Sequence, residues 1–157
     1  MKSLTILGIA IWIRFPNEEV LLQQKIFQKG KIKIIYFEPL KGWVGTNEFT
    51  EEALKRLIKE NVGFYGKMKL SFRQIKREFF GIPGKGTAVR YHFLVDFPYE
   101  VDLKENVQLI GREDLKKIKR MSEKGKNFQR DIILFDNDYK VLFKIFGVEA
   151  REISLFF

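Results

Sequence analysis

The amino-acid sequence predicts a fold of the α/β (α+β) class, in which a mixed β-sheet packs with helices in one domain spanning residues 1–157. Two observations lead to this prediction. Strand-like apolar segments alternate with segments of helical periodicity, and no linker, repeat or break in composition divides the chain. With 45% apolar and 15% aromatic residues, the chain is also able to build a hydrophobic core.

The first part of the chain is expected to hold three strands and a helix. The strands are rich in β-branched and aromatic residues and cover residues 4–15, 20–27 and 32–37. The turn signal Pro16-Asn17 separates the first two. The helix covers residues 50–62 with Thr50 as its expected N-cap. Its apolar residues recur at spacings of three to four: Ala53, Leu54, Leu57, Ile58 and Val62.

The second part of the chain begins with two strand-like stretches, residues 69–80 and 87–97. The glycine-rich segment 81–86 joins them. It is similar to a phosphate-binding loop, but it lacks the Gly-Lys-Ser/Thr ending and the helix that should follow, so a hairpin turn is the better interpretation. Three later segments complete the prediction: a strand-like stretch at 107–110, a helix at 112–121, and residues 128–146 as either a helix or a hairpin.

The charge and the missing residue types narrow the chemistry. The chain has 29 Lys and Arg against 20 Asp and Glu, a net charge of +9, and this basic balance favours phosphate-bearing partners. It has no Cys and one His, so a bound metal would need oxygen ligands and would be a hard ion such as Mg²⁺ or Mn²⁺. The apolar run at residues 4–13 is too short to span a membrane and lacks a signal-peptidase site, so a cytoplasmic protein without a membrane partner is expected.

Residues 42–64 carry the most specific pattern in the chain. They resemble the Nudix (MutT-like) family, whose box reads G-x5-E-x7-R-E-U-x-E-E-x-G-U, where U is a bulky apolar residue. The positions in register are Gly42, Glu48, Arg56, Ile58, Glu60 and Gly63. The resemblance implies a Nudix-type α/β/α sandwich with a mixed sheet, in which the box helix covers about residues 50–62. It also implies that Glu48 and Arg56 tie the loop to the helix, while Gly42 and Gly63 supply backbone freedom.

The box is degenerate at the positions that carry the family's chemistry. Three glutamates at i, i+3 and i+4 hold a divalent metal against a pyrophosphate in the family, and the chain has Leu57, Glu60 and Asn61 there. Leu57 has no ligand atom, and Asn61 offers only a neutral carbonyl oxygen. By resemblance, Glu60 is the expected metal ligand and catalytic carboxylate, with Asn61 as a second ligand. A further carboxylate from a later loop is expected at Glu100, Asp102 or Glu105.

Other candidate residues lie outside the acidic positions of the box. Lys41 and Trp43 flank the box glycine and are expected to bind ligand, since an aromatic face stacks on a nucleobase; the alternative for Trp43 is packing at the rim of the site. His92, within an apolar run, is expected to be structural. Basic residues that could collect phosphates or an RNA backbone form two groups: Lys67, Lys69, Arg73, Lys76 and Arg77, and Lys116 to Arg120.

Three functions are compatible with this pattern. The first is a Nudix-fold protein that binds a nucleoside-diphosphate-containing ligand or nucleic acid, with pyrophosphohydrolase activity lost or strongly reduced. The second is a divergent Mg²⁺-dependent Nudix hydrolase that cleaves a nucleoside diphosphate linked to another moiety. The third is an RNA-binding or assembly scaffold that uses the basic surface. The sequence leaves enzymatic activity and oligomeric state open.

Overall fold

A computed structural model of the chain describes residues 5–62, 70–98, 105–120 and 132–147. These residues form two compact units, one within residues 1–17 and 39–105 and the other within residues 18–38 and 106–157. The single domain over residues 1–157 stays a prediction. Within the described ranges, no helix is both long and apolar enough to cross a membrane.

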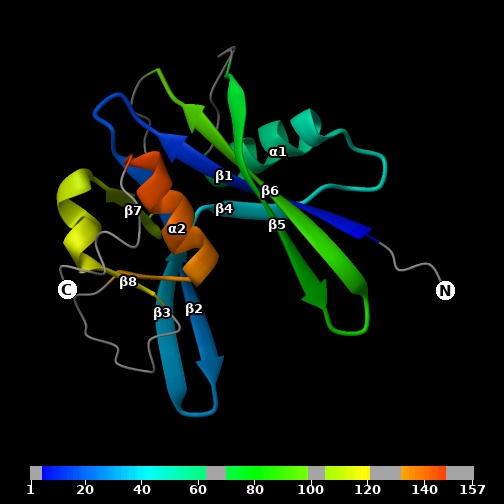
Figure 1. The fold of residues 1–157 in the computed structure, drawn as a ribbon, viewed down its shortest axis with the longest axis horizontal. Coiled ribbons are helices and arrows are strands. Elements are labelled where there is room, and N and C mark those ends of the chain that lie inside the picture. Colours follow the sequence, from blue (N-terminus) through cyan, green and yellow to red (C-terminus); the bar gives the residue numbers. More distant parts are fainter. Residues whose placement is uncertain (1–4, 63–69, 99–104, 121–131, 148–157) are drawn as a thin grey trace. The chain divides into compact units, whose positions relative to one another are not determined.

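The first unit is built on a mixed sheet (Figure 1). Its strands are β1 (Thr5–Arg14), β4 (Leu40–Trp43), β5 (Phe72–Ile82) and β6 (Gly86–Asp96). They lie in the order β4-β1-β6-β5, with β1 and β6 parallel and the other two pairs antiparallel. Strand β1 contributes a continuous buried segment from Ile9 to Ile13, as expected for a strand with apolar neighbours on both faces.

Helix α1 (Thr50–Val62) belongs to the first unit and packs against its strand β4, and the bounds of the helix are those predicted. The buried residues Ala53, Leu54, Leu57 and Ile58 form its apolar face. The N-cap prediction is wrong by one residue. The amide of Ala53 donates to the carbonyl of Phe49 at 3.0 Å, so Phe49 accepts the first helical hydrogen bond and holds the cap position that we expected for Thr50.

The glycine-rich segment is a hairpin turn, as predicted. Strand β5 pairs with β6 from Phe72↔Val95 to Ile82↔Gly86, and no helix follows the turn. Gly84 and Gly86 have φ values of 76° and 104°, a region that side chains disfavour, so the glycines are needed for the turn itself.

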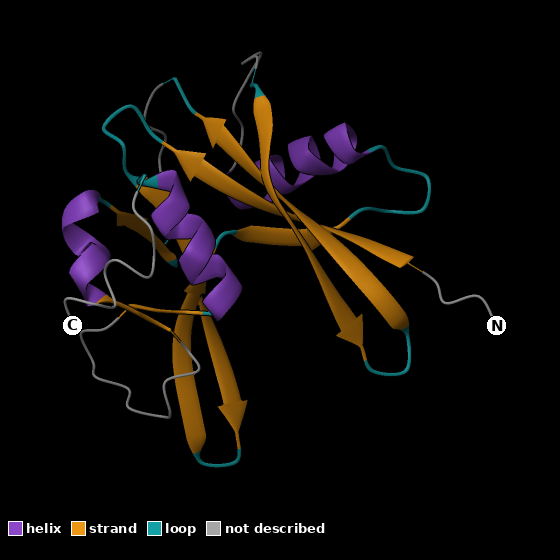
Figure 2. Cartoon of the chain, in the orientation of Figure 1, coloured by secondary structure: helices purple, strands orange, loops and turns teal. Residues whose placement is uncertain are grey.

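The second unit contains the remaining elements, whose helices are purple in Figure 2. Strand β2 (Val20–Lys29) pairs antiparallel with β3 (Ile32–Glu38) along its second half and with β7 (Val107–Ile110) at its start. A 3₁₀-helix, η1 (Arg112–Lys117), leads into β8 (Ile118–Arg120), which pairs parallel with β9 (Ile132–Leu134). Helix α2 (Asp136–Ile145) follows β9.

Two predictions for this unit are corrected or decided. The expected helix over residues 112–121 is wrong, because a short 3₁₀-helix ends at Lys117 and the chain then becomes a strand. Buried Ile118 pairs with Ile132, and this non-local strand pairing overrides a helical spacing of apolar residues. Of the two interpretations of residues 128–146, helix is confirmed for Asp136–Ile145, after the short strand β9. Residues 128–131 lie outside the described ranges.

Candidate functional site

A salt bridge between Glu48 and Arg56 joins the loop after β4 to helix α1. The guanidinium donates two parallel hydrogen bonds to the carboxylate, Nε to Oε2 at 2.8 Å and Nη2 to Oε1 at 3.0 Å. Nη2 also donates to the carbonyl of Trp43 at 2.9 Å. A bidentate pair that also holds a backbone carbonyl fixes the loop geometrically as well as energetically. The contact is the one that the resemblance implies for Glu48 and Arg56, and their roles as structural box residues stay a prediction.

The same contacts determine the protonation of Glu48. Its carboxylate accepts hydrogen bonds from Arg56 and from the amide of Gly45, the latter at 3.0 Å. These hydrogen bonds, Arg56 first, lower the pKa of Glu48 from 4.5 to about 2. The carboxylate is therefore ionised throughout the neutral range.

Leu57 packs against the backbone of Gly42. Leu57 is buried, with 5% of its surface exposed. A Cβ built on Gly42 would lie 2.6 and 2.7 Å from the two δ-carbons of Leu57, far inside van der Waals contact. The absence of a side chain at position 42 therefore allows helix α1 and strand β4 to approach at this point, with an apolar side chain filling the contact.

Positions 57, 60 and 61, which carry the three glutamates in the family, are called the acidic trio below. Its second and third residues, Glu60 and Asn61, differ in their surroundings. Glu60 is 55% exposed and forms an i,i+4 ion pair with Arg56, Oε2 to Nη1, at 3.6 Å. Asn61 donates its side-chain Nδ2–H to the backbone carbonyl of Leu57 at 2.7 Å. The trio thus presents one carboxylate, one amide bonded back to its own helix, and one buried hydrocarbon side chain.

Lys41 and Trp43 lie on the opposite face of β4 from the Leu57 contact. Successive strand residues point to opposite faces, so Gly42 faces the helix while its two neighbours face away. In the register of the sheet, Trp43 lies opposite Gly8 and Lys41 lies opposite Ala10 on β1. The structure therefore brings these two predicted ligand-binding residues together on one face of the sheet. Trp43 is 46% exposed there.

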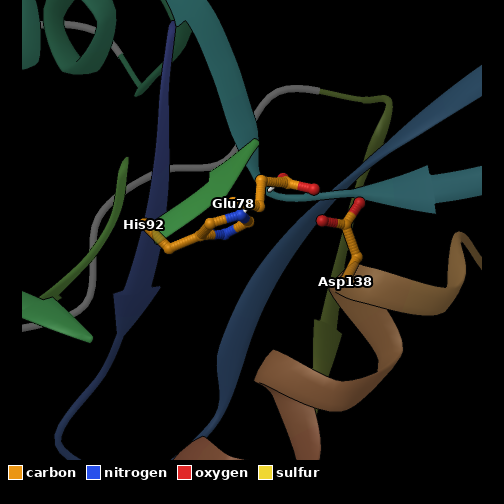
Figure 3. Close-up of side chains that lie close together, drawn as sticks. All are labelled: Glu78, His92 and Asp138. Carbon is orange, nitrogen blue, oxygen red and sulfur yellow. Dashed lines mark hydrogen bonds and ion pairs between the residues drawn. The ribbon is translucent and has the colours of Figure 1, made fainter. Parts of the chain in front are cut away.

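A buried hydrogen-bonded chain crosses the same sheet, and Figure 3 shows two of its members, His92 and Glu78. The indole N–H of Trp12 donates to Nδ1 of His92 at 3.0 Å, and Nε2 of His92 lies 2.7 Å from Oε1 of Glu78. Nη1 of Arg90 donates to the same oxygen at 3.1 Å. Because an indole can only donate, Nδ1 accepts, and the ring N–H is therefore the one on Nε2, which faces Glu78.

This chain keeps Glu78 ionised although it is buried. Burial alone would raise the pKa of the carboxyl, but the contacts with His92 and Arg90 outweigh it and lower the pKa to about 2. His92 and Trp12 have no exposed surface. The structural role expected for His92 agrees with this environment, since both ring nitrogens have protein partners.

Comparison with known structures identifies the fold. A NUDIX family hydrolase from Clostridium perfringens superimposes with a TM-score of 0.57 over 90% of this chain and 95% of its own, at 16% sequence identity. The MutT protein of Methanosarcina mazei gives a TM-score of 0.51 over 73% of this chain and 83% of its own, at 16% identity. The dihydroneopterin triphosphate pyrophosphohydrolase of E. coli gives 0.50 over 66% and 77%, at 19% identity. The chain has the Nudix fold. No family model matches the sequence, and no curated protein matches it.

The Nudix fold and its mixed sheet, expected from the sequence, are thus confirmed. The three-carboxylate metal site implied by the Nudix resemblance does not fit the residues present, because Leu57 is buried hydrocarbon and the amide of Asn61 is bonded to Leu57. Of the three positions 57, 60 and 61, Glu60 is the one that carries a carboxylate. The assignments of Glu60 as catalytic and of Glu60 and Asn61 as ligands remain predictions.

Several predicted Nudix-box and loop residues lie outside the described ranges. Gly63, Glu100 and Asp102 are among them. Glu105 is described and is exposed in the turn before β7. The loop carboxylate therefore stays a prediction, with no contact to report.

Sequence reasoning did not single out Glu78, Arg90 or Trp12. A signal for one pair was present. A hairpin centred on Gly84 places Glu78 and Arg90 at equal distances from the turn, so the predicted strands already make them cross-strand neighbours of opposite charge. The partnership of Trp12 with His92 depends on the parallel pairing of β1 with β6, which no local pattern specifies.

Proposed function

We propose that this Nudix-fold chain binds a nucleoside-diphosphate-containing ligand and that its pyrophosphohydrolase activity is lost or strongly reduced. The packing of buried Leu57 against Gly42 is the observation that carries the proposal. It converts a position of the Nudix box that would carry a carboxylate into part of the hydrophobic core. A hard divalent ion and its water nucleophile have no partner in such a side chain.

The charge of the chain supports ligand binding. A net charge of +9 favours phosphates, and the acidic trio of the box retains one carboxylate instead of three, so a bound diphosphate meets less repulsion at this helix. The negative charge of Glu48 is already balanced by the positive charge of Arg56 in their salt bridge. Lys41 and Trp43 are the proposed ligand-binding side chains of β4.

Turnover assays test the loss of hydrolysis. The protein would be incubated with dNTPs, ADP-ribose and dinucleoside polyphosphates in the presence of Mg²⁺ or Mn²⁺, and phosphate-containing products would be measured. We expect binding without turnover. Turnover that disappears in the Glu60→Gln variant would overturn the proposal, because it would show that one remaining carboxylate suffices.

A complementary experiment restores the missing carboxylates. The double variant Leu57→Glu, Asn61→Glu should gain metal-dependent turnover. The matched control is Leu57→Gln, Asn61→Gln, which introduces side chains of the same shape without charge and should stay inactive. Since Leu57 is buried, circular dichroism of both variants must show that they fold, and the control accounts for any effect of the polar substitution itself.

A divergent metal-dependent hydrolase is the second candidate. The exposure of Glu60 favours it, since Mg²⁺ binds through as few as one or two carboxylates plus substrate phosphates. In this candidate Glu60 and the oxygen of Asn61 would hold Mg²⁺ or Mn²⁺, and a loop carboxylate such as Glu100 would act as base. The Glu60→Gln assay separates it from the first candidate.

Nucleic acid is the alternative ligand. The β5–β6 hairpin carries an exposed Phe79 with the guanidinium of Arg77 5.2 Å from its ring centroid, and Arg73 is exposed nearby on the same strand. Aromatic and basic side chains in alternation suit single-stranded nucleic acid. If this surface binds RNA, the affinity will fall steeply as salt rises, and it will drop in the double variant Arg73→Gln, Arg77→Gln.

A further inference from the structure

One row of residues across the first unit joins an exposed indole to a fixed guanidinium. The register places Trp43, Gly8, Arg90 and Glu78 side by side on β4, β1, β6 and β5. Cross-strand partners point to the same face of a sheet, so the indole and the guanidinium flank a residue without a side chain.

The absence of a side chain at Gly8 allows the indole of Trp43 to pack directly against strand β1. A Cβ built on Gly8 would be 3.1 Å from Cζ3 and 3.3 Å from Cε3 of Trp43, so the six-membered ring rests directly over β1. Phe80 supports the indole from the side, with 6.3 Å between ring centroids at an angle of 42°. Trp43 nevertheless keeps 46% of its surface exposed, which is unusual for a tryptophan supported in this way.

Arg90 is held in place from two directions. Its guanidinium carbon lies 4.6 Å from the centroid of the Phe80 ring, and its Nη1 donates to Glu78. Glu78 is itself fixed by His92, and His92 by Trp12. The hydrogen bond to Glu78 occupies one of the five N–H donors of the guanidinium, and within the described part of the chain no second acceptor bonds to Arg90.

We infer that Trp43, Gly8, Phe80 and Arg90 form the recognition platform for the base of a bound nucleotide. The base stacks on the exposed indole, and Arg90 donates a hydrogen bond to an acceptor at the edge of that base. The inference rests on the proposed function, because it places the base of the proposed nucleotide ligand. It adds Arg90 as a binding residue and gives Glu78 and His92 positioning roles.

Pairing with Glu78 explains why Arg90 is assigned to the base instead of to the diphosphate. The carboxylate 3.1 Å away neutralises much of the charge that would attract a phosphate, but it leaves N–H donors in a fixed geometry. A neutral acceptor on a flat ring suits such a group. Immobilising Arg90 and Trp43 in the free protein also lowers the entropy lost on binding.

Calorimetric titration with ADP and with inorganic pyrophosphate tests the inference. The Trp43→Leu variant should bind ADP about 10- to 100-fold more weakly than the wild type. The Arg90→Met variant, which keeps the apolar stem and loses the donors, should bind ADP about tenfold more weakly. Neither variant should change the affinity for pyrophosphate, which has no base.

Matched controls exist on the same unit. Phe49→Leu removes an aromatic residue that is 79% exposed, and Arg14→Met removes an arginine that forms an exposed ion pair with Asp96 at the end of β1. Both controls should bind ADP like the wild type. Arg90→Lys, which retains a donor, should bind ADP more tightly than Arg90→Met.

Fluorescence of the wild type avoids any folding defect of the variants. The chain has two tryptophans, and Trp12 is fully buried, so acrylamide quenching reports on Trp43. ADP should protect Trp43 from acrylamide, and pyrophosphate should not. If ADP binds without protecting Trp43, or if Trp43→Leu binds ADP as tightly as the wild type, the platform is refuted while nucleotide binding stands. If neither ADP nor pyrophosphate binds, the proposed function fails and the platform fails with it.

Discussion

The close approach of Gly42 and Leu57 makes a quantitative prediction about the box helix. A methyl group added by Gly42→Ala would lie 2.6 and 2.7 Å from the δ-carbons of Leu57, about 1 Å closer than the usual contact of roughly 3.5–4.0 Å between carbons. Leu57 is 5% exposed and sits in a packed contact, so it has little room to retreat. Overpacking of this kind lowers the free energy of unfolding by about 1–3 kcal/mol.

Truncating Leu57 should remove the loss of stability that Gly42→Ala causes. Leu57→Ala alone leaves a cavity and should lower the free energy of unfolding by about 2–5 kcal/mol. In the double variant Gly42→Ala, Leu57→Ala, the δ-carbons are gone and the new methyl group fills part of the cavity. The double variant should therefore be no less stable than Leu57→Ala, which corresponds to a coupling energy of about 1–3 kcal/mol.

Urea unfolding of the four proteins at pH 7, followed by circular dichroism, measures this coupling. Gly81→Ala is the control glycine, because a Cβ built there meets nothing within 4 Å, and its effect should add to that of Leu57→Ala. If the effects of Gly42→Ala and Leu57→Ala add to within about 0.5 kcal/mol, the two residues do not share a contact. The account of Leu57 as a core residue would then be wrong.

Three further predictions concern the charged and hydrogen-bonded groups. The pKa of Glu48 is lowered from 4.5 to about 2, so its stabilising effect is fully present above pH 4.5 and is lost as the pH falls towards 2. Urea unfolding between pH 6 and pH 2 should therefore show a smaller loss of stability in Glu48→Gln than in the wild type, and parallel curves would contradict this. Trp12→Phe removes the donor to Nδ1 of His92 and should lower the free energy of unfolding by about 1–3 kcal/mol, whereas Phe49→Leu, at a side chain that is 79% exposed, should change it by less than about 0.5 kcal/mol. Glu78→Gln leaves Arg90 without its carboxylate and should cost about 1.5–3 kcal/mol, against less than about 1 kcal/mol for Asp96→Asn, which breaks an exposed pair with Arg14; equal costs would show that burial of Glu78 is immaterial.

Local patterns were sufficient for most elements of the fold. The bounds of helix α1 and the β5–β6 turn follow from periodicity and glycine positions, both of which act over a few residues. The prediction failed where a distant partner decides the conformation. Residues Ile118–Arg120 lie within the helix expected over 112–121, yet they form a strand because Ile132 and its neighbours pair with them in parallel.

The candidate site also divides into features that the sequence predicts and features that depend on contacts between distant residues. The tie between Glu48 and Arg56 could be predicted, because the resemblance to the box assigns both roles. The packing of Leu57 against Gly42 could not be, since the sequence shows the loss of a carboxylate but not where the replacing side chain points. Glu78 and Arg90 could have been paired from the predicted hairpin, whereas the contact of Trp12 with His92 depends on the parallel pairing of β1 with β6.

Successive residues of β4 point to opposite faces of the sheet. The contact with the box helix therefore lies on one face, and the residues proposed to bind the base lie on the other. Gly42 faces Leu57 and the box helix, while Lys41 and Trp43 face the other side of the sheet with Arg90. A change at Leu57 therefore alters the helix contact without disturbing the indole over Gly8. It follows that Leu57→Glu with Asn61→Glu should raise turnover while ADP-dependent protection of Trp43 from acrylamide stays as in the wild type. A loss of that protection in the double variant would show that the two faces of β4 are energetically coupled, and the division of roles between them would not hold.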